Sequence, residues 1–399
     1  MIPLLPAGHL PQPFDAAFLD NPYPRYAQLR EESAVHRVAL PDGSPIWLVL
    51  REEDVRAGLT DTRLSVNKAH SGTGYKGFSL PPALDANLLN IDPEDHQRLR
   101  RLVSKAFTAR RVEGMRGSVQ AAVDRLADDL AGQGGGDLVS AFSLPLPLRV
   151  IGDLLAVPEA DRRRFSTWVS NMLTPESPRQ IKDAVENIHA FLLDLVATRR
   201  RALGDDMLSA LIAVRDEGDQ LSEDELVSLA FLLLMAGSEN TQHLISAGLV
   251  TLLQHPDQVA ELRADPSLLS EAVEELLRYA HPNQMAIRRF PTEPIGIGGT
   301  QIPAGDTVML CLASAHRDPA RYPSPDEFDI HRQDKAHLAL GQGMHYCLGA
   351  PLARMEIQIA LHTLLRRFPR LDLAVPPEQL PWRVSFRSRA LKAVPITLR

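Results

Sequence analysis

The chain has 399 residues, of which 44% are hydrophobic and 23% charged, a composition typical of a globular protein that excludes an intrinsically disordered one. Its formal net charge of -7 gives no general attraction for nucleic acid, so no nucleic-acid partner is expected. The length exceeds the roughly 250 to 300 residues at which single cores usually stop growing, so on length alone about two domains are expected.

Cysteine content and the N-terminal sequence indicate the cellular setting. Cys311 and Cys347 are too few for a disulfide framework and belong to no C-x-x-C pair, which fits a reducing compartment. Residues 1–6 have neither a basic segment nor a long apolar run. We therefore expect a soluble, cytoplasmic protein without a membrane partner.

Helical periodicity dominates the chain. In order, helices are expected over 95–106, 119–131, 181–203, 223–254, 268–279 and 351–368. Strand-like runs are fewer, at 46–50, 295–302, 307–312 and 393–398. The glycine-rich stretch 132–136 indicates a flexible surface connection. The predicted fold class is mainly α with a minor β portion.

The longest expected helix, 223–254, has clear boundaries. Ser222 followed by Glu225 forms a capping box before the apolar run, and Pro256 ends the helix. About 30 residues at a rise of ~1.5 Å span roughly 45 Å, enough to cross the molecule. The uncharged run 226–237 is shorter than the ~20 residues of a membrane span, so it predicts a buried, central helix.

A glycine-rich loop carries one cysteine to the start of an expected helix: Gly341-Gln342-Gly343-Met344-His345-Tyr346-Cys347-Leu348-Gly349. Glycines let a backbone approach a flat ligand closely, and the free N–H groups of a helix N-terminus stabilise a thiolate. His345 can reach an acidic group of the same ligand. Cys311, in a strand, is expected to be a small buried apolar residue. The spacing does not fit a dinucleotide-binding motif, because Tyr346 stands where the third glycine belongs.

This loop closely resembles the G-x-G-x-H-x-C-x-G haem-binding signature of bacterial cytochromes P-450, and the resemblance extends from about Pro22 to Leu398. It implies the cytochrome P-450 fold, with residues 1–399 as a single catalytic domain in place of two. The implied cofactor is haem b (iron protoporphyrin IX), with Cys347 as the metal ligand. One position departs from the signature: Leu340 precedes the first glycine, where the family usually has Phe.

The resemblance also assigns further residues of the site. Those expected to contact haem or its propionates are His96, Arg100, Gly237, Arg289, Gly341, Gly343, His345 and Gly349. His96 and Arg100 lie one helical turn apart, so both can hydrogen-bond to one carboxylate. Glu275 and Arg278 resemble the E-x-x-R pair of the family, which ties the core to a downstream arginine, here Arg332.

The segment from Ala236 to Thr241 departs from the A-G-x-[D/E]-T pattern of the family. The resemblance makes Glu239 the acid that feeds protons and puts Asn240 in the place of the Thr that assists oxygen activation. Thr241 follows one residue late, about 100° further round the helix, so its hydroxyl does not simply substitute. Glu239, Asn240 and Thr241 are the candidate catalytic residues. Gly237, which costs about 1 kcal/mol in a helix interior, indicates a close approach by a ligand.

The implied activity is that of a monooxygenase. Such an enzyme activates O2 at a Cys-ligated haem and hydroxylates or epoxidises a bulky small organic substrate, here expected to be a secondary metabolite. By family position, the substrate pocket includes Met235, Ala236, Asn283, Met285, Ile287, Ser385 and Phe386. These side chains mix apolar and polar character, which favours a partly polar small molecule over a fatty acid.

Electrons are expected from partner proteins, because the sequence shows no flavin or iron-sulfur module. The resemblance implies a ferredoxin and a ferredoxin reductase that draw on NAD(P)H, with the chain itself a monomer. A basic cluster follows the helix expected to back onto the thiolate side of the haem: Arg100, Arg101, Lys105, Arg110 and Arg111. A negatively charged ferredoxin would be attracted there, although a solvated basic face is the simpler interpretation.

Two alternatives from other classes stay open. A haem-thiolate enzyme that performs oxidative coupling or peroxide-driven oxidation is favoured by Asn240, which lacks the usual hydroxyl. A haem-binding sensor or carrier is disfavoured by Glu239, since a carrier needs no acid in the middle of a helix.

Overall fold

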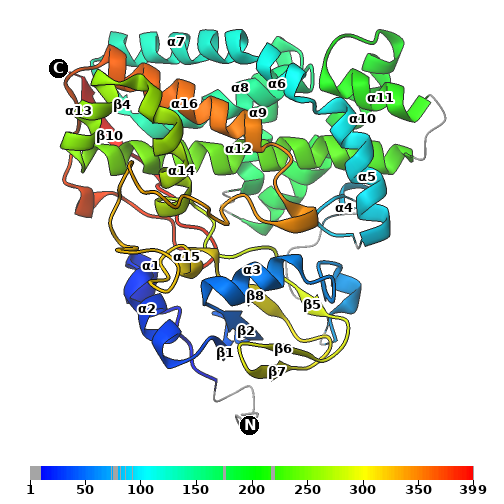
Figure 1. Cartoon of the computed structure of the whole chain (residues 1–399). Helices are drawn as coiled ribbons and strands as arrows, with labels where there is room; N and C mark the ends of the chain where they lie inside the picture. The colour runs from blue at the N-terminus through cyan, green and yellow to red at the C-terminus, as the bar shows by residue number, and fades with distance from the viewer. Residues whose placement is uncertain are drawn as a thin grey trace.

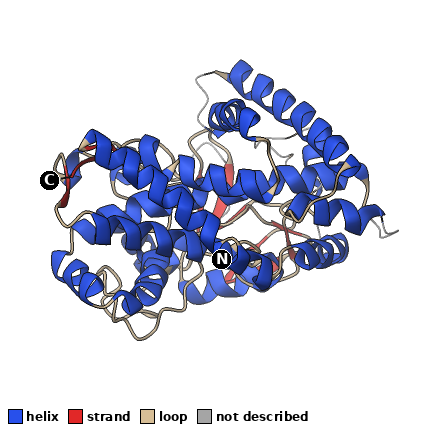
Figure 2. Ribbon diagram, turned by 90° about the horizontal axis from the view of Figure 1, so that it is seen from above, coloured by secondary structure: helices blue, strands red, loops and turns tan. Residues whose placement is uncertain are grey.

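The computed structural model describes residues 10–72, 74, 80, 82–85, 87–91, 93–173, 177–216 and 221–398. Figure 1 shows a helical region through which the long helix α12 runs, and a smaller region that holds most of the strands. From above, helices cover most of the molecule and the strands form a minor part (Figure 2). The mainly α architecture expected from the sequence is present.

The helices follow the chain in this order: α1 (Ala16–Asp20), α2 (Tyr23–Glu32), α3 (Glu52–Thr60), α4 (Pro82–Asp85), α5 (Pro93–Ala106), α6 (Ala109–Gly114), α7 (Arg116–Gln133), α8 (Pro145–Leu154), α9 (Glu159–Leu173), α10 (Pro178–Arg201), α11 (Met207–Asp216), α12 (Glu223–Leu253), α13 (Pro256–Ala264), α14 (Leu269–Tyr279), α15 (Leu312–Ala315) and α16 (Ala350–Arg367). The strands are β1 (Val35–Ala39), β2 (Pro45–Val49), β3 (Leu64–Ser65), β4 (Gly135–Asp137), β5 (Phe290–Pro291), β6 (Ile295–Ile297), β7 (Thr300–Ile302), β8 (Val308–Leu310), β9 (Leu371–Leu373) and β10 (Pro395–Leu398).

Helix α12 is the expected central helix. The Ser222 hydroxyl accepts the Glu225 N–H at 3.1 Å, and the Glu225 carboxylate accepts the Ser222 N–H at 2.8 Å, so the capping box is complete. The helix packs against α4, α8, α10 and α16, and most of its side chains are buried. No helix of the described ranges is long and apolar enough to cross a membrane.

Small sheets build the rest of the fold. Strand β2 pairs with β1 antiparallel and with β8 parallel, and β10 joins β4 to β9. The single strand expected over 295–302 is wrong: β6 and β7 form a hairpin, in register from Ile295 opposite Ile302. Gly298 and Gly299, with φ of 52° and 76°, reverse the chain there, and adjacent glycines at positive φ are typical of tight hairpin turns.

The flexible connection expected over 132–136 is also wrong in part. Helix α7 ends at Gln133, and Gly135–Asp137 pairs with β10 as strand β4. A Cβ on Gly135 would lie 2.4 Å from the carbonyl oxygen of Ile396, so the glycine serves a close backbone approach. The glycine run therefore makes a tight strand instead of a loose linker.

Candidate active site

Cys347 ends a tightly bonded loop that leads into α16. Its N–H donates to the carbonyl oxygen of Leu340 at 2.8 Å, and Gly341 and Gly343 have φ of 72° and 69°. Side chains with a Cβ rarely adopt such positive φ, which explains both glycines. Burial raises the pKa of the Cys347 thiol, while the backbone N–H of Gly349 opposes that rise. A positively charged ligand of the sulfur would favour the thiolate.

A basic cluster lies beside this loop. The rings of His96, from α5, and His345 are edge to face with their centroids 4.5 Å apart. Both ring nitrogens of His96, Nδ1 of His345 and Nε of Arg289 are buried without a hydrogen-bond partner in the described structure. Burial, followed by the charges of Arg100 and Arg289, lowers the pKa of His96 to about 4. Four basic side chains from distant parts of the sequence therefore gather at one place.

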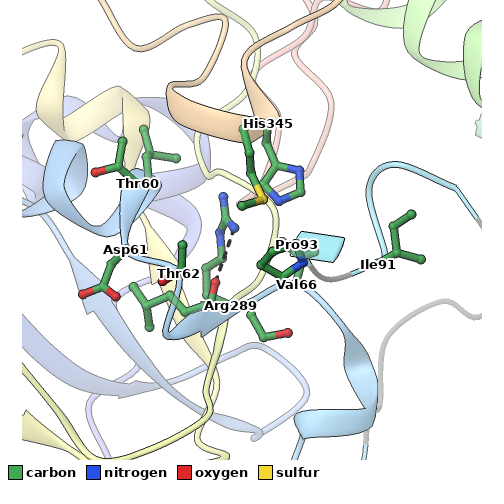
Figure 3. Close-up of a pocket in the computed structure, with 12 residues that line it drawn as sticks. Thr60, Asp61, Thr62, Val66, Ile91, Pro93, Arg289 and His345 are labelled. Carbon is green, nitrogen blue, oxygen red and sulfur yellow. Dashed lines mark hydrogen bonds between the residues drawn. The ribbon is translucent and has the colours of Figure 1, made fainter. Parts of the chain in front are cut away.

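The unpartnered donors fit an anionic ligand. Arg289 is 4% exposed, and its hydrogen bond from Nη1 to the Leu64 carbonyl oxygen is long at 3.4 Å. Burial lowers its pKa to about 10, as expected for a guanidinium without a carboxylate partner. Figure 3 shows Arg289 and His345 in the wall of a pocket that Thr60 and Pro93 also line. Carboxylates of a haem would satisfy these donors, so the residues fit this cofactor.

The E-x-x-R pair forms a buried network with Arg332. Arg278 donates to Glu275 through Nε at 2.8 Å and Nη2 at 2.7 Å, and Arg332 Nε donates to the same carboxylate at 3.1 Å. Arg278 also donates to the carbonyl oxygens of His316 and Pro325. The network ties α14 to the segment that precedes the cysteine loop.

One face of α12 is open in the middle of an otherwise buried helix. Ala236 is exposed, and Leu233 and Asn240, which lie three and four residues from it, are partly exposed. This spacing follows one side of a helix, so Asn240 lies on the open face. Thr241 is only 5% exposed and lies outside that face, as its position one residue later requires.

Glu239 lies beside the open face, and its carboxylate is close to two basic side chains. Arg383 Nη1 donates to Glu239 Oε1 at 3.2 Å, and His243 Nε2 lies 3.6 Å from the same oxygen. Burial raises the pKa of Glu239, but the hydrogen bonds and charges of these two neighbours outweigh burial and lower it. The carboxylate is therefore ionised at neutral pH while it stays paired.

Gly237 allows a close approach between two helices. A Cβ at this position would lie 2.3 Å from Cδ1 of Ile151, a residue of α8. The glycine therefore lets α8 and α12 pack closely, and its expected contact with haem stays a prediction.

The residues expected in the substrate pocket fall into two groups. Met285 is 6% exposed in the core cluster that contains Cys311, and Phe386 packs on that cluster with its ring centroid 5.0 Å from Phe14. Of these two side chains only Met285 is buried, since Phe386 is partly exposed. The others also keep some exposure: Met235, Ala236, Asn283, Ile287 and Ser385. Their place in a substrate pocket stays a prediction.

Two side chains of the site were missed in the sequence. His243 follows Glu239 by four residues, a spacing that puts both on one side of a helix and would have indicated the contact. Arg383 lies 144 residues from Glu239 and carries no local signal.

Known proteins resemble this chain in sequence and in structure. Residues 163–391 match the family model described as "Cytochrome P450". Cytochrome P450 monooxygenase PikC of Streptomyces venezuelae is 46% identical over 100% of this chain and 95% of its own. The 6-deoxyerythronolide B hydroxylase of Saccharopolyspora erythraea is 42% identical over 94% of this chain and 96% of its own. The structure of the polyketide synthase cytochrome P450 PksS of Bacillus subtilis superposes with a TM-score of 0.90 at 36% identity, covering 97% of this chain and 99% of that one. The fold class and the family expected from the sequence are confirmed: the chain belongs to the cytochrome P450 family and is a haem-thiolate monooxygenase.

Proposed function

We propose that Cys347 would bind the haem iron and that His96, Arg100, Arg289 and His345 would hold the propionates. The cluster of buried, unpartnered donors beside the cysteine loop carries this assignment. When bound, haem supplies the activation of O2 and the insertion of one oxygen atom into the substrate, with the thiolate donating electron density. We further propose that residues 1–399 form one catalytic domain, since PikC aligns with the whole chain.

Glu239 is proposed to carry protons into the cavity. Its carboxylate sits between the open face of α12 and the partly exposed Arg383, so it can exchange protons with solvent on one side. To deliver a proton, the side chain must leave Arg383 and turn toward the open face. Because Asn240 cannot give away one proton and take up another, delivery past it requires ordered water or a substrate hydroxyl.

Replacement of Asn240 tests its place in the cavity. Asn240→Ala removes an amide that can donate a hydrogen bond to dioxygen, so we expect roughly 10-fold more peroxide released per product formed. Asn240→Thr restores a donor of similar size and should retain coupled turnover. Steady-state turnover with peroxide counted is the measurement. Coupling in Asn240→Ala equal to that of the unmodified enzyme would remove Asn240 from the reaction.

The proposed substrate is a bulky metabolite of the polyketide class. The name of the PksS relative refers to polyketide synthesis, and another relative is named as a 6-deoxyerythronolide B hydroxylase. The exposed Ala236 has a small side chain, which leaves room for a large ligand over α12. A panel of polyketides and fatty acids should be screened for the shift of the Soret band that accompanies displacement of water from the iron. A response to fatty acids alone would contradict this substrate class.

We propose that electrons come from NAD(P)H through a ferredoxin reductase and a ferredoxin, and that the ferredoxin docks on the α5–α6 basic patch (Arg101, Lys105 and Arg110). All three side chains are exposed, and Arg100 of the same helix faces Cys347. Arg111 differs, since it donates to the carbonyl oxygen of Ala106 at 2.8 Å and so helps to fold the patch.

Charge reversal at Arg101 and Arg110 should slow reduction by a negatively charged ferredoxin roughly 10-fold at low salt. For the unmodified protein, the rate of reduction should fall as the salt concentration rises, because exposed charges are screened over about 10 Å at 0.1 M salt. Stopped-flow reduction is the measurement. Arg179→Glu, whose side chain is 89% exposed on α10, is the matched control. An unchanged rate and salt dependence in the double variant would exclude the patch.

A further inference from the structure

Two imidazoles hold the backbone at the entry to the cysteine loop. The N–H of Leu338 donates to His316 Nε2 at 2.9 Å, and the N–H of Ala339 donates to His337 Nδ1 at 3.2 Å. A backbone N–H can only donate, so Nε2 of His316 carries a lone pair and no proton while it accepts from Leu338. His316 is therefore neutral while the loop is held in this way.

The held segment is continuous with the loop. The carbonyl oxygen of Leu338 accepts the N–H of Gly341 at 2.9 Å, and that of Leu340 accepts the N–H of Cys347 at 2.8 Å. His316 is fixed in turn, because it is 1% exposed and its carbonyl oxygen accepts from Arg278 at 2.8 Å. Successive hydrogen bonds thus connect the buried E-x-x-R network, through His316, to the cysteine.

We propose that His316 is a positioning residue for Cys347: its neutral imidazole fixes Leu338, and protonation of that ring at acid pH releases the loop and detaches the thiolate from iron. The inference rests on the proposed function, in which Cys347 binds the haem iron.

The surroundings of His316 disfavour its charged form. The rings of His281 and His337 lie with centroids 6.2 and 6.1 Å from it, and the guanidinium groups of Arg278 and Arg317 also face it. Burial, followed by these neighbours, lowers the pKa of His316 well below its usual range. The unfolded chain takes up this proton near pH ~6.5. The stability that the neutral ring contributes is therefore fully present above that pH and is lost as the pH falls through the lower, folded-state pKa.

Three variants of the haem-loaded protein test the role. His316→Gln keeps a side-chain oxygen that accepts the Leu338 N–H but does not titrate in this range. His316→Leu keeps apolar bulk and accepts no hydrogen bond. His281→Gln is the matched control, since His281 is also buried, with its pKa lowered to about 4, yet its ring hydrogen-bonds to the carbonyl oxygen of Asn283 and not to the loop. The readout is the red-shifted Soret band of the reduced, CO-bound protein between about pH 8 and about pH 4, with helix content followed by circular dichroism.

The unmodified protein should show this band at about pH 8 and lose it on acidification before it loses its helices. His316→Gln should move the midpoint of the loss down by about one pH unit or more, whereas His281→Gln should not move it down, because His316 still titrates. His316→Leu should lose the band roughly 10-fold faster at neutral pH. A midpoint in His316→Gln equal to that of the unmodified protein would overturn the positioning role, even if His316→Leu does not fold. Absence of the band from the unmodified protein at about pH 8 would instead overturn the assignment of Cys347 as ligand.

Discussion

Cys347→His is expected to abolish the red-shifted Soret band of the reduced, CO-bound protein and, with it, turnover. The thiolate is the donor that gives this band and favours O–O cleavage, and a neutral imidazole provides neither. The loop should still fold, because its glycines and the hydrogen bond from the residue 347 N–H to Leu340 do not involve the sulfur. Absorption spectroscopy and helix content measured on the same sample separate loss of the ligand from loss of the fold.

Cys311→Ala is the matched control for the ligand. Cys311 is fully buried, and burial raises the pKa of its thiol to about 12, so it remains a thiol at neutral pH. The variant should keep the band and lose only some stability, since a buried small side chain is truncated. The opposite pattern, with the band lost in Cys311→Ala and kept in Cys347→His, would show that the wrong cysteine has been assigned.

Glu239→Gln is expected to slow turnover by roughly 10² to 10⁴-fold, the usual contribution of a positioned acid-base group. The amide keeps the shape of the side chain and still accepts from Arg383, but it cannot carry a proton. The binding of substrate, followed by the Soret shift, should change little, so the loss should appear in turnover.

Asp224→Asn removes a carboxylate from the same helix, at an exposed position in its first turn, and should leave turnover unchanged. Arg383→Gln should raise the pKa of Glu239, because a cation that favours the carboxylate is removed. The pH dependence of turnover should then shift upward. Turnover and coupling in Glu239→Gln that match the unmodified enzyme would exclude proton delivery by Glu239 and favour chemistry that needs no protonation.

The features that the sequence predicted well depend on local signals. The start of α12 could be placed because the side chains of Ser222 and Glu225, within one turn, each accept a hydrogen bond from the backbone N–H of the other. The cysteine loop was recognised by its resemblance to the haem-binding signature, and the structure adds that Gly341 and Gly343 adopt positive φ. The helical position of Asn240 and Thr241 followed from geometry alone, and the structure has Asn240 on the open face and Thr241 off it.

The features that were missed depend on packing between distant segments. The glycine at position 237 predicted a close approach, but the sequence does not reveal that Ile151 of another helix packs against it. Gly135 looked like part of a linker because nothing local indicates its pairing with β10. The contact between Arg383 and Glu239 likewise exists only after residues far apart in the chain have been brought together.

The fate of oxygen tests the proposed reaction most directly. A polyketide that shifts the Soret band should be incubated with the enzyme, a ferredoxin, its reductase, NADPH and heavy-isotope-labelled dioxygen, and the product analysed by mass spectrometry. Monooxygenation predicts that one labelled oxygen atom enters the product and that none comes from water. A product that is oxidised or coupled but carries no label would contradict it, and would assign the Asn240-containing site to oxidative coupling or peroxide-driven chemistry.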